Sequence, residues 1–340
     1  MPSSTTRESA EAPPGTAAEV ERHPRFDLRR IGTPNIVGTL VFFAATLIYF
    51  GTQVDNFFSG PNIDGVLTLA VPLGLSAIGQ TFVIIGGGFD ISITGVAALS
   101  SVTYGLLING HGVLFSTVGA LVVGLLSGLV SGALVTRLSV NPLIATLATA
   151  SITSGTAFAI TGGQTKPVTS NSGDFWAGLT SFGVNKEVFI LVAFAIIAGV
   201  TLRYTAFGRR LFATGGNREA AELGGVRVGA MTISSYAISG VCSGAAGIVL
   251  TSQLLGIAPS VGATLALDSI AAVVLGGAAL TGGVGGIGGT ILGVLILGCI
   301  GNGLNLMQVQ SYYQTIIKGI VLVIAVVFSQ ARTLIRQHFG

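Results

Sequence analysis

Charged residues are scarce in this sequence: Lys, Arg, Asp and Glu make up 9% of its 340 residues, against about 25% in soluble domains. It has only two cysteines and three histidines, so neither a disulfide framework nor a zinc-type cluster is indicated. The ATP-binding motif G-x-x-x-x-G-K-[ST] is absent, and no basic patch with interleaved aromatics suggests nucleic acid. These absences argue against an enzyme, a metal or cofactor protein, and a nucleic-acid binder.

Apolar residues and glycine are what the sequence has in abundance. Half of it is hydrophobic, its mean hydropathy is +0.81, and it contains 51 glycines. A helix needs about 20 apolar residues to cross a membrane, and repeated runs of about this length predict an all-α polytopic membrane protein with about ten transmembrane helices. The expected spans are 36–53, 66–86, 92–109, 113–136, 143–161, 187–203, 230–252, 261–281, 286–305 and 312–329.

The two ends of the chain are polar. Residues 1–34 form a tail whose low hydrophobicity predicts disorder, residues 35–332 form the transmembrane domain, and residues 333–340 form a C-terminal tail. The long polar start argues against a cleaved signal peptide. If both termini are cytoplasmic, every arginine lies on the cytoplasmic side of the membrane, and the three lysines lie on or near the outer side. The positive-inside rule predicts such a bias.

One charged segment, residues 203–229, lies between two apolar runs. Hydrocarbon excludes such a segment, so we expect a water-facing cytoplasmic loop. Its run Asn217–Leu223 favours a short helix bracketed by paired glycines. Such a helix can seat in a groove of a soluble partner, and a solvated basic loop is the plainer alternative. The residues expected to make this contact are Arg209, Gly215, Gly216, Asn217, Arg218, Glu219, Ala220, Ala221 and Leu223.

Two aspartates stand in similar settings, Asp90 in FDISITGVAAL and Asp268 in LDSIAAVVLGG. About five spans separate them, which predicts two halves of opposite orientation, an inverted repeat. Glycines before Asp90 interrupt the apolar run there. The short run after Asp268 indicates either a broken helix or a span that begins upstream near Val261 with Asp268 embedded. Each carboxylate could contact solute or a gate, or cap a helix; we favour the cap for Asp90 and leave both interpretations open for Asp268.

Further polar residues complete the candidate solute pathway. Asn141-Pro142 begins a span, and a plain helix start is the favoured interpretation there. The glycine in Thr161-Gly162 suits a helix C-cap. The candidate pathway residues are Asp90, Ser92, Asn141, Thr146, Asp268 and Asn302.

Two glycine series have four-residue spacing, Gly124-Gly128-Gly132 and Gly285-Gly289-Gly293. Spacing of this kind lets helix backbones approach closely in lipid, so we expect helix packing. The stretch 283–288 formally matches G-x-G-x-x-G, but neither a strand nor a βαβ unit accompanies it. We therefore do not expect dinucleotide binding.

The sequence resembles the permease subunit of ribose-type ABC sugar importers. The segments that carry the resemblance are 87–93 (GGFDISI), 141–147 (NPLIATL), 161–163 (TGG), 205–209 (TAFGR), 215–221 (GGNREAA), 267–273 (LDSIAAV), 276–277 (GG) and 302–304 (NGL). Ile93-Thr94 departs from the family's usual Val-Gly, and the long N-terminal tail is atypical.

The resemblance implies a role and a set of partners. It implies a multi-pass protein of the bacterial cytoplasmic (inner) membrane that moves a monosaccharide or similar solute by alternating access. The implied partners are cytoplasmic P-loop ATPase subunits, which carry ATP and Mg, an extracytoplasmic solute-binding protein, a second permease chain and membrane lipid. An ion-coupled secondary transporter, using Asp90 or Asp268, is the alternative.

Overall fold

The computed structural model describes residues 36–169, 176, 185–321, 323–324 and 327. The chain divides into Met1–Arg30, which lies outside these residues, and Ile31–Gly340, to which all that follows refers. Both predicted tails and part of the predicted span 312–329 also lie outside the described residues.

Helices make up most of the described structure. Their bounds are α1 Ile36–Gln53, α2 Gly60–Ile85, α3 Ile93–Arg137, α4 Pro142–Thr161, α5 Lys186–Tyr204, α6 Ala206–Gly216, α7 Arg218–Leu223, α8 Val228–Leu254, α9 Leu265–Leu275 and α10 Ile287–Leu306. Residues 311–321 are also helical. Two short strands, β1 Lys166–Pro167 and β2 Gly256–Ile257, pair antiparallel.

Six of the described helices are long and apolar enough to cross a membrane: α2, α3, α4, α5, α8 and α10. The all-α polytopic class is therefore confirmed. The predicted spans 92–109 and 113–136 both fall in α3, where Gly112 adopts a non-helical conformation (φ 74°, ψ 167°) and divides the element into two helices. The predicted span 261–281 is only the 11-residue helix α9, which agrees with the broken-helix alternative for the run after Asp268.

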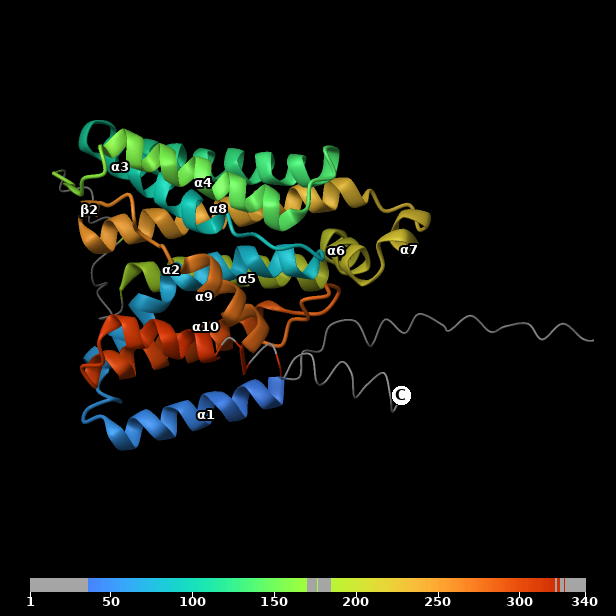
Figure 1. The fold of residues 1–340 in the computed structure, drawn as a ribbon. Helices are drawn as coiled ribbons and strands as arrows, with labels where there is room; N and C mark the ends of the chain where they lie inside the picture. Colours follow the sequence, from blue (N-terminus) through green and yellow to red (C-terminus); the bar gives the residue numbers. More distant parts are fainter. Residues whose placement is uncertain (1–35, 170–175, 177–184, 322, 325–326, 328–340) are drawn as a thin grey trace, which may run out of the picture. The chain divides into compact units, whose positions relative to one another are not determined.

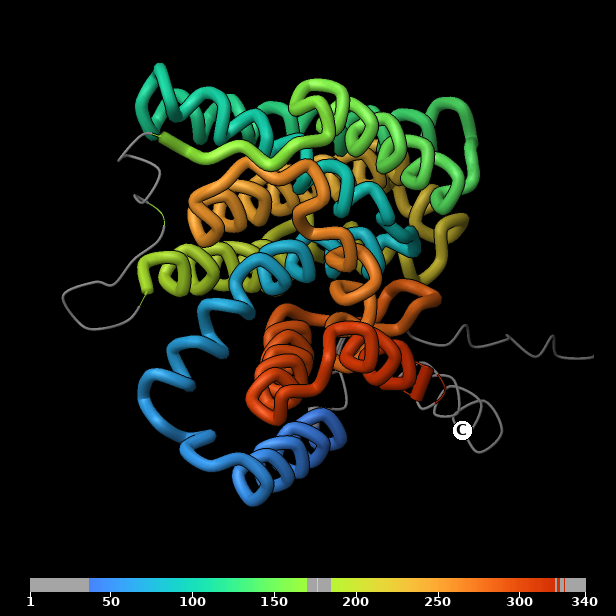
Figure 2. Tube along the Cα trace, turned by 60° about the vertical axis from the view of Figure 1, so that its left-hand side comes forward, coloured from blue at the N-terminus to red at the C-terminus, as the bar shows by residue number. Residues whose placement is uncertain are grey.

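The helices pack around α2 and α8, as Figure 1 shows. Helix α8 packs along α3, which also contacts α4, and α2 contacts α8, α5, α9 and α10. Helix α10 in turn packs against α9 and α1. The tube in Figure 2 shows α10 lying between α1 and the rest of the bundle. Of the 18-residue apolar stretch of α2 that could cross a membrane, 83% is buried, compared with 22% of the corresponding stretch of α5. Helix α2 is therefore a central helix.

Both glycine series lie at close helix contacts, as predicted. A Cβ atom at Gly128 of α3 would collide with the carbonyl oxygen of Tyr236 in α8, and one at Gly293 of α10 with that of Ala272 in α9. Small residues allow this approach of backbones in membrane helices. Gly285 is the exception, because it lies before the start of α10.

Candidate functional site

The charged central segment folds into two capped helices. The hydroxyl of Thr205 accepts a hydrogen bond from the N–H of Gly208 at 3.3 Å and caps α6. The Oδ1 of Asn217 accepts one from the N–H of Ala220 at 2.9 Å and caps α7. Side chains at this position satisfy N–H groups that have no partner within the helix. The predicted short helix at 217–223 is thus present, with Asn217 as its N-cap.

Helix α7 presents almost all of its side chains to solvent. Only Ala221 is buried, while Leu223 is 91% exposed. Arg218 and Glu222 form an ion pair of 3.6 Å on this surface, and pairs this exposed contribute little to stability. An apolar side chain held out at the end of a short helix is available to a partner.

Helix α6 is the part of the charged segment that packs against the membrane helices. Leu211 is fully buried and packs in one apolar cluster with Phe82 and Ile85 of α2, whereas Arg209 and Arg210 are exposed. The buried residues of α6 repeat at helical spacing, which gives it one apolar face. The segment between the spans thus contains a packed helix that we did not predict, because the sequence reasoning weighed the charges and not this spacing.

The glycine-containing end of α6 meets two glycine-containing connections. The N–H of Gly283 donates to the carbonyl oxygen of Ile85 at 2.9 Å, and a Cβ at Gly215 would collide with that same oxygen. A Cβ at Gly282 would lie 2.9 Å from the Cα of Gly87 and 2.7 Å from the carbonyl oxygen of Gly215. We call Gly87, Gly215, Gly282 and Gly283 the glycine junction. It joins the end of α6 to the segments that precede α3 and follow α9.

Asp90 is buried and fully bonded. Its Oδ1 accepts from the N–H and hydroxyl of Ser92 at 2.8 and 2.5 Å, and its Oδ2 accepts from the hydroxyl of Ser239 at 2.6 Å. The Tyr236 hydroxyl also donates to the carbonyl oxygen of Phe89 at 3.0 Å. Ser92, not Asp90, occupies the N-cap position of α3. Asp90 therefore fastens the connection before α3 to α8. The N-cap role that we favoured for it was wrong, because Ser92 holds that position and Asp90 lies two residues before it.

Two further pathway candidates have local partners. The Oδ1 of Asn141 accepts from the N–H of Leu143 at 2.9 Å and caps α4. The hydroxyl of Thr146 donates to the carbonyl oxygen of Pro142 at 2.8 Å, within the same helix. The helix-start interpretation of Asn141-Pro142 agrees with this geometry. The glycine expected as a C-cap, Gly162, ends α4 in the left-handed conformation (φ 67°, ψ 25°).

Asp268 lies in the first turn of α9 and has two partners. Its Oδ2 accepts from the Thr264 hydroxyl at 2.9 Å and pairs with the Nζ of Lys318 at 3.2 Å. The aspartate side chain is 15% exposed and the lysine side chain 30%. The pair joins the broken helix α9 to the helix at 311–321. Sequence reasoning had not connected Asp268 with Lys318, since the pairing depends on how the last helix packs.

Several polar atoms are buried in apolar helices without a hydrogen-bond partner among the described residues. They include Oδ1 of Asn302, the hydroxyl of Ser76, both amide atoms of Gln80 and Oε2 of Glu187. Ser76 and Gln80 were missed by the sequence reasoning. A signal was present, because Gln80 places an amide well inside the predicted span 66–86.

Gln253, unlike Gln80, has hydrogen-bond partners for its amide nitrogen. The Nε2 of Gln253 in α8 donates to Oε1 of Glu187 at 3.1 Å and to the carbonyl oxygen of Thr68 at 3.0 Å. The Nδ2 of Asn185 donates to Oδ2 of Asp64 at 2.9 Å and to the Thr68 hydroxyl at 2.6 Å. This network ties together the ends of α2, α5 and α8.

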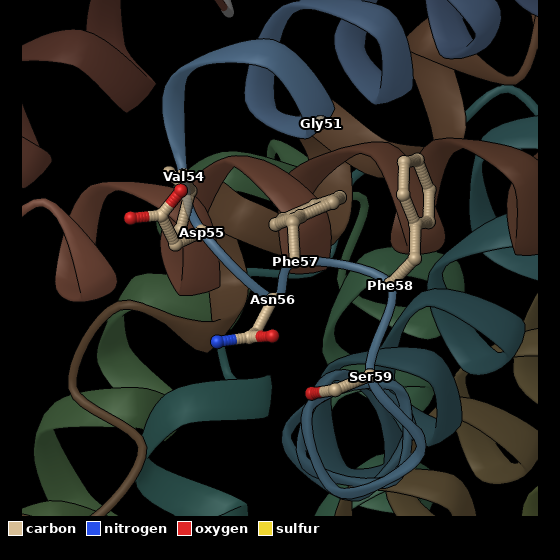
Figure 3. A pocket seen from close by; sticks show the side chains of 7 residues that line it. All are labelled: Gly51, Val54, Asp55, Asn56, Phe57, Phe58 and Ser59. Atoms are coloured by element: carbon tan, nitrogen blue, oxygen red, sulfur yellow. The ribbon is translucent and has the colours of Figure 1, made fainter.

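A surface hollow lies in the turn between α1 and α2, lined by Gly51, Val54, Asp55, Asn56, Phe57, Phe58 and Ser59. In Figure 3 the rings of Phe57 and Phe58 extend toward α1 while the Asn56 amide points the opposite way. Phe57 stacks on Phe50, with ring centroids 5.7 Å apart. The aromatic contact gives this turn a structural role. Within the described residues, no group of His, Cys, Asp and Glu could hold a metal ion.

Comparison with known proteins places these features in a family context. Residues 62–326 match the family model described as "Branched-chain amino acid transport system / permease component". A ribose import permease protein of Bacillus subtilis is 39% identical over 283 residues, which cover 82% of this chain and 87% of the relative. An L-arabinose transport system permease protein of Escherichia coli is 38% identical over 302 residues, covering 86% and 90%. No solved structure matches the chain.

Proposed function

The chain belongs to the family of permease components of branched-chain amino acid transport systems, and from this premise we propose how it works. It is the permease subunit of an ABC sugar importer. It is not itself an enzyme, and ATP is hydrolysed on a separate subunit. The names of its relatives, a ribose and an arabinose permease, favour a monosaccharide of pentose size as the solute.

The cytoplasmic ATPase subunits, which would carry ATP and Mg, dock on α7. The observation that carries this assignment is the exposed, capped helix that ends in Leu223, 91% exposed. A partner that covers this leucine would remove its apolar surface from water, which favours association. Arg218 and Glu219 supply charged contacts beside the anchor. A second permease chain and an extracytoplasmic solute-binding protein complete the importer.

Motion of α7 reaches the membrane helices through the glycine junction. Gly215 lies in the last turn of α6, against the connections that lead into α3 and away from α9. Backbones in contact leave no flexible side chain to absorb a displacement, so a shift of α6 and α7 moves both connections. Nucleotide-driven closure of the ATPases would thereby switch the helices between inward and outward openings, as in alternating access.

The transmembrane domain consists of about ten spans in two inverted halves, with both termini in the cytoplasm. The first turns of α3 and α9 support this arrangement, because Ile93 and Leu265 pack in one cluster with Leu73 at the midpoint of α2. Each of these helices follows a non-helical connection. A discontinuous helix such as α9, packed against a central helix, is typical of a transporter's solute site. The domain lies in the bacterial cytoplasmic (inner) membrane.

Co-purification tests the docking assignment. We expect a P-loop ATPase to co-purify with the wild-type permease from its native membrane, and Glu219→Lys and Leu223→Asp each to reduce the amount recovered. Leu138→Asp is the matched control, because Leu138 is also an exposed leucine next to a helix end but lies outside the central segment. Equal recovery with all three variants would remove α7 as the docking site.

A further inference from the structure

Ser76 and Gln80 are the polar groups of α2 that the fold leaves unexplained. Both residues are 0% exposed, and the Ser76 hydroxyl and both Gln80 amide atoms lack hydrogen-bond partners within the described part of the chain. Leaving such groups unpaired costs about 1–3 kcal/mol each. Gln253 shows that this fold can satisfy a glutamine where its role is structural.

The two residues share one face of α2. They are four positions apart, so they lie one above the other on the helix. At about 100° per residue, this face lies between that of Ala77 and that of Gly79. Ala77 packs with Ala271 and other residues of α9 and α10, and a Cβ at Gly79 would lie 2.8 Å from the Cα of Ser239 in α8. Ser76 and Gln80 therefore belong to the sector of α2 between α8 and α9.

This sector begins where the first turns of α3 and α9 pack against α2. Leu73, one turn before Ser76 and Ala77, packs against Ile93 and Ala97 of α3 and Leu265 of α9. Helix α9 has only 11 residues, and positive φ angles at Leu255 and Gly262 before it and Gly277 after it mark irregular connections on both sides. A short helix between two such connections is the element whose displacement would uncover this face of α2.

We infer that Ser76 and Gln80 line the solute pathway and hydrogen-bond the hydroxyls of the sugar when α9 moves away from α2. A primary amide has two N–H donors and an acceptor oxygen, and a serine hydroxyl both donates and accepts hydrogen bonds. These groups can therefore hydrogen-bond neighbouring hydroxyls of a sugar. The fully buried state described here is then the pathway without solute. The inference rests on the proposed function, since it assigns contacts for the solute of that importer.

The test uses the whole importer, with its ATPase and binding protein, in proteoliposomes supplied with labelled D-ribose and L-arabinose. Gln80→Leu removes the amide and keeps the volume, and Gln253→Leu is the matched control. We expect Gln80→Leu to lower the maximal uptake rate about tenfold with KM unchanged, because the separate binding protein captures the sugar. Its Tm should equal or exceed that of the wild type, since no protein hydrogen bond is lost, whereas Gln253→Leu should lower Tm.

The combination of slower uptake and undiminished Tm is the result that a structural role would not give. Uptake by Gln80→Leu within threefold of the wild-type rate would overturn the inference, and so would a fall in Tm as large as that of Gln253→Leu. If Gln80→Leu does not assemble, Ser76→Ala is judged by the same two readouts. A wild-type importer that takes up neither sugar with ATP would instead count against the proposed function, so the two failures are distinguishable.

Discussion

We expect Gly215→Ala, which adds a single methyl group, to weaken the coupling between ATP hydrolysis and sugar transport. The new Cβ would collide with the carbonyl oxygen of Ile85 and would lie 2.7 Å from the backbone nitrogen of Gly283. These are backbone atoms, so helix α6 must shift, and overpacking of this kind costs about 1–3 kcal/mol. Alanine regains about 0.5–1 kcal/mol of helix propensity. The net cost should lower Tm by a few degrees.

The adjacent glycine supplies the control. Gly216 also lies in α6, but a Cβ there would have no heavy atom within 4 Å, so Gly216→Ala should leave Tm unchanged or slightly raised. Both variants are assembled into the importer, and sugar uptake is measured per ATP hydrolysed. We expect Gly215→Ala to lower this ratio at least about threefold and Gly216→Ala to leave it unchanged. Equal ratios in the two variants would refute the junction as the route of coupling.

Three further predictions concern the Asp90–Ser239 hydrogen bond, the Asp268–Lys318 ion pair and the docking helix α7. Ser239→Ala should lower the free energy of unfolding by about 1–3 kcal/mol, because it removes a hydrogen-bond donor to buried Asp90. Ser243→Ala should lower it less, because the Ser243 hydroxyl bonds a carbonyl oxygen of its own helix. Equal losses in thermal unfolding of the two variants would contradict this prediction. Lys318→Met should destabilise the protein more than the double variant Lys318→Met/Asp268→Asn does, because the single variant leaves the Asp268 carboxylate without its ion-pair partner. A double-mutant cycle in which the losses of unfolding free energy simply add would contradict this prediction. Asn217→Ala should cost about 1 kcal/mol of α7 stability and weaken ATPase recovery at unchanged overall Tm, and full recovery would show that the cap does not matter for docking.

The membrane class and the central segment were predictable from the sequence because both depend on local composition. Apolar length sets the spans, and the run Asn217–Leu223, bracketed by glycines, is enough to predict a short capped helix. The glycine series at Gly128 and Gly293 likewise predicted close packing. These features depend on neighbours along the chain, which a sequence displays directly.

The polar contacts were less predictable because they depend on tertiary packing. Asp90 is bonded by Ser239 across 149 positions of sequence, and Asp268 is paired with Lys318 across 50. Nothing local to either aspartate indicates this distant partner. The apolar face of α6, centred on Leu211, could have been predicted from the helical spacing of its residues, but the sequence reasoning gave more weight to the neighbouring charges. Gln80 was visible as a lone amide in an apolar span, although only the structure shows that both its amide atoms are unpartnered.

The most direct measurement is sugar uptake by the reconstituted permease with and without its ATPase. As the permease subunit of an ABC importer, the chain should accumulate labelled sugar only when the ATPase, the binding protein and hydrolysable ATP are all present. A non-hydrolysable analogue should abolish accumulation. Uptake that continues without the ATPase and follows an imposed proton or sodium gradient would contradict this function and indicate an ion-coupled transporter.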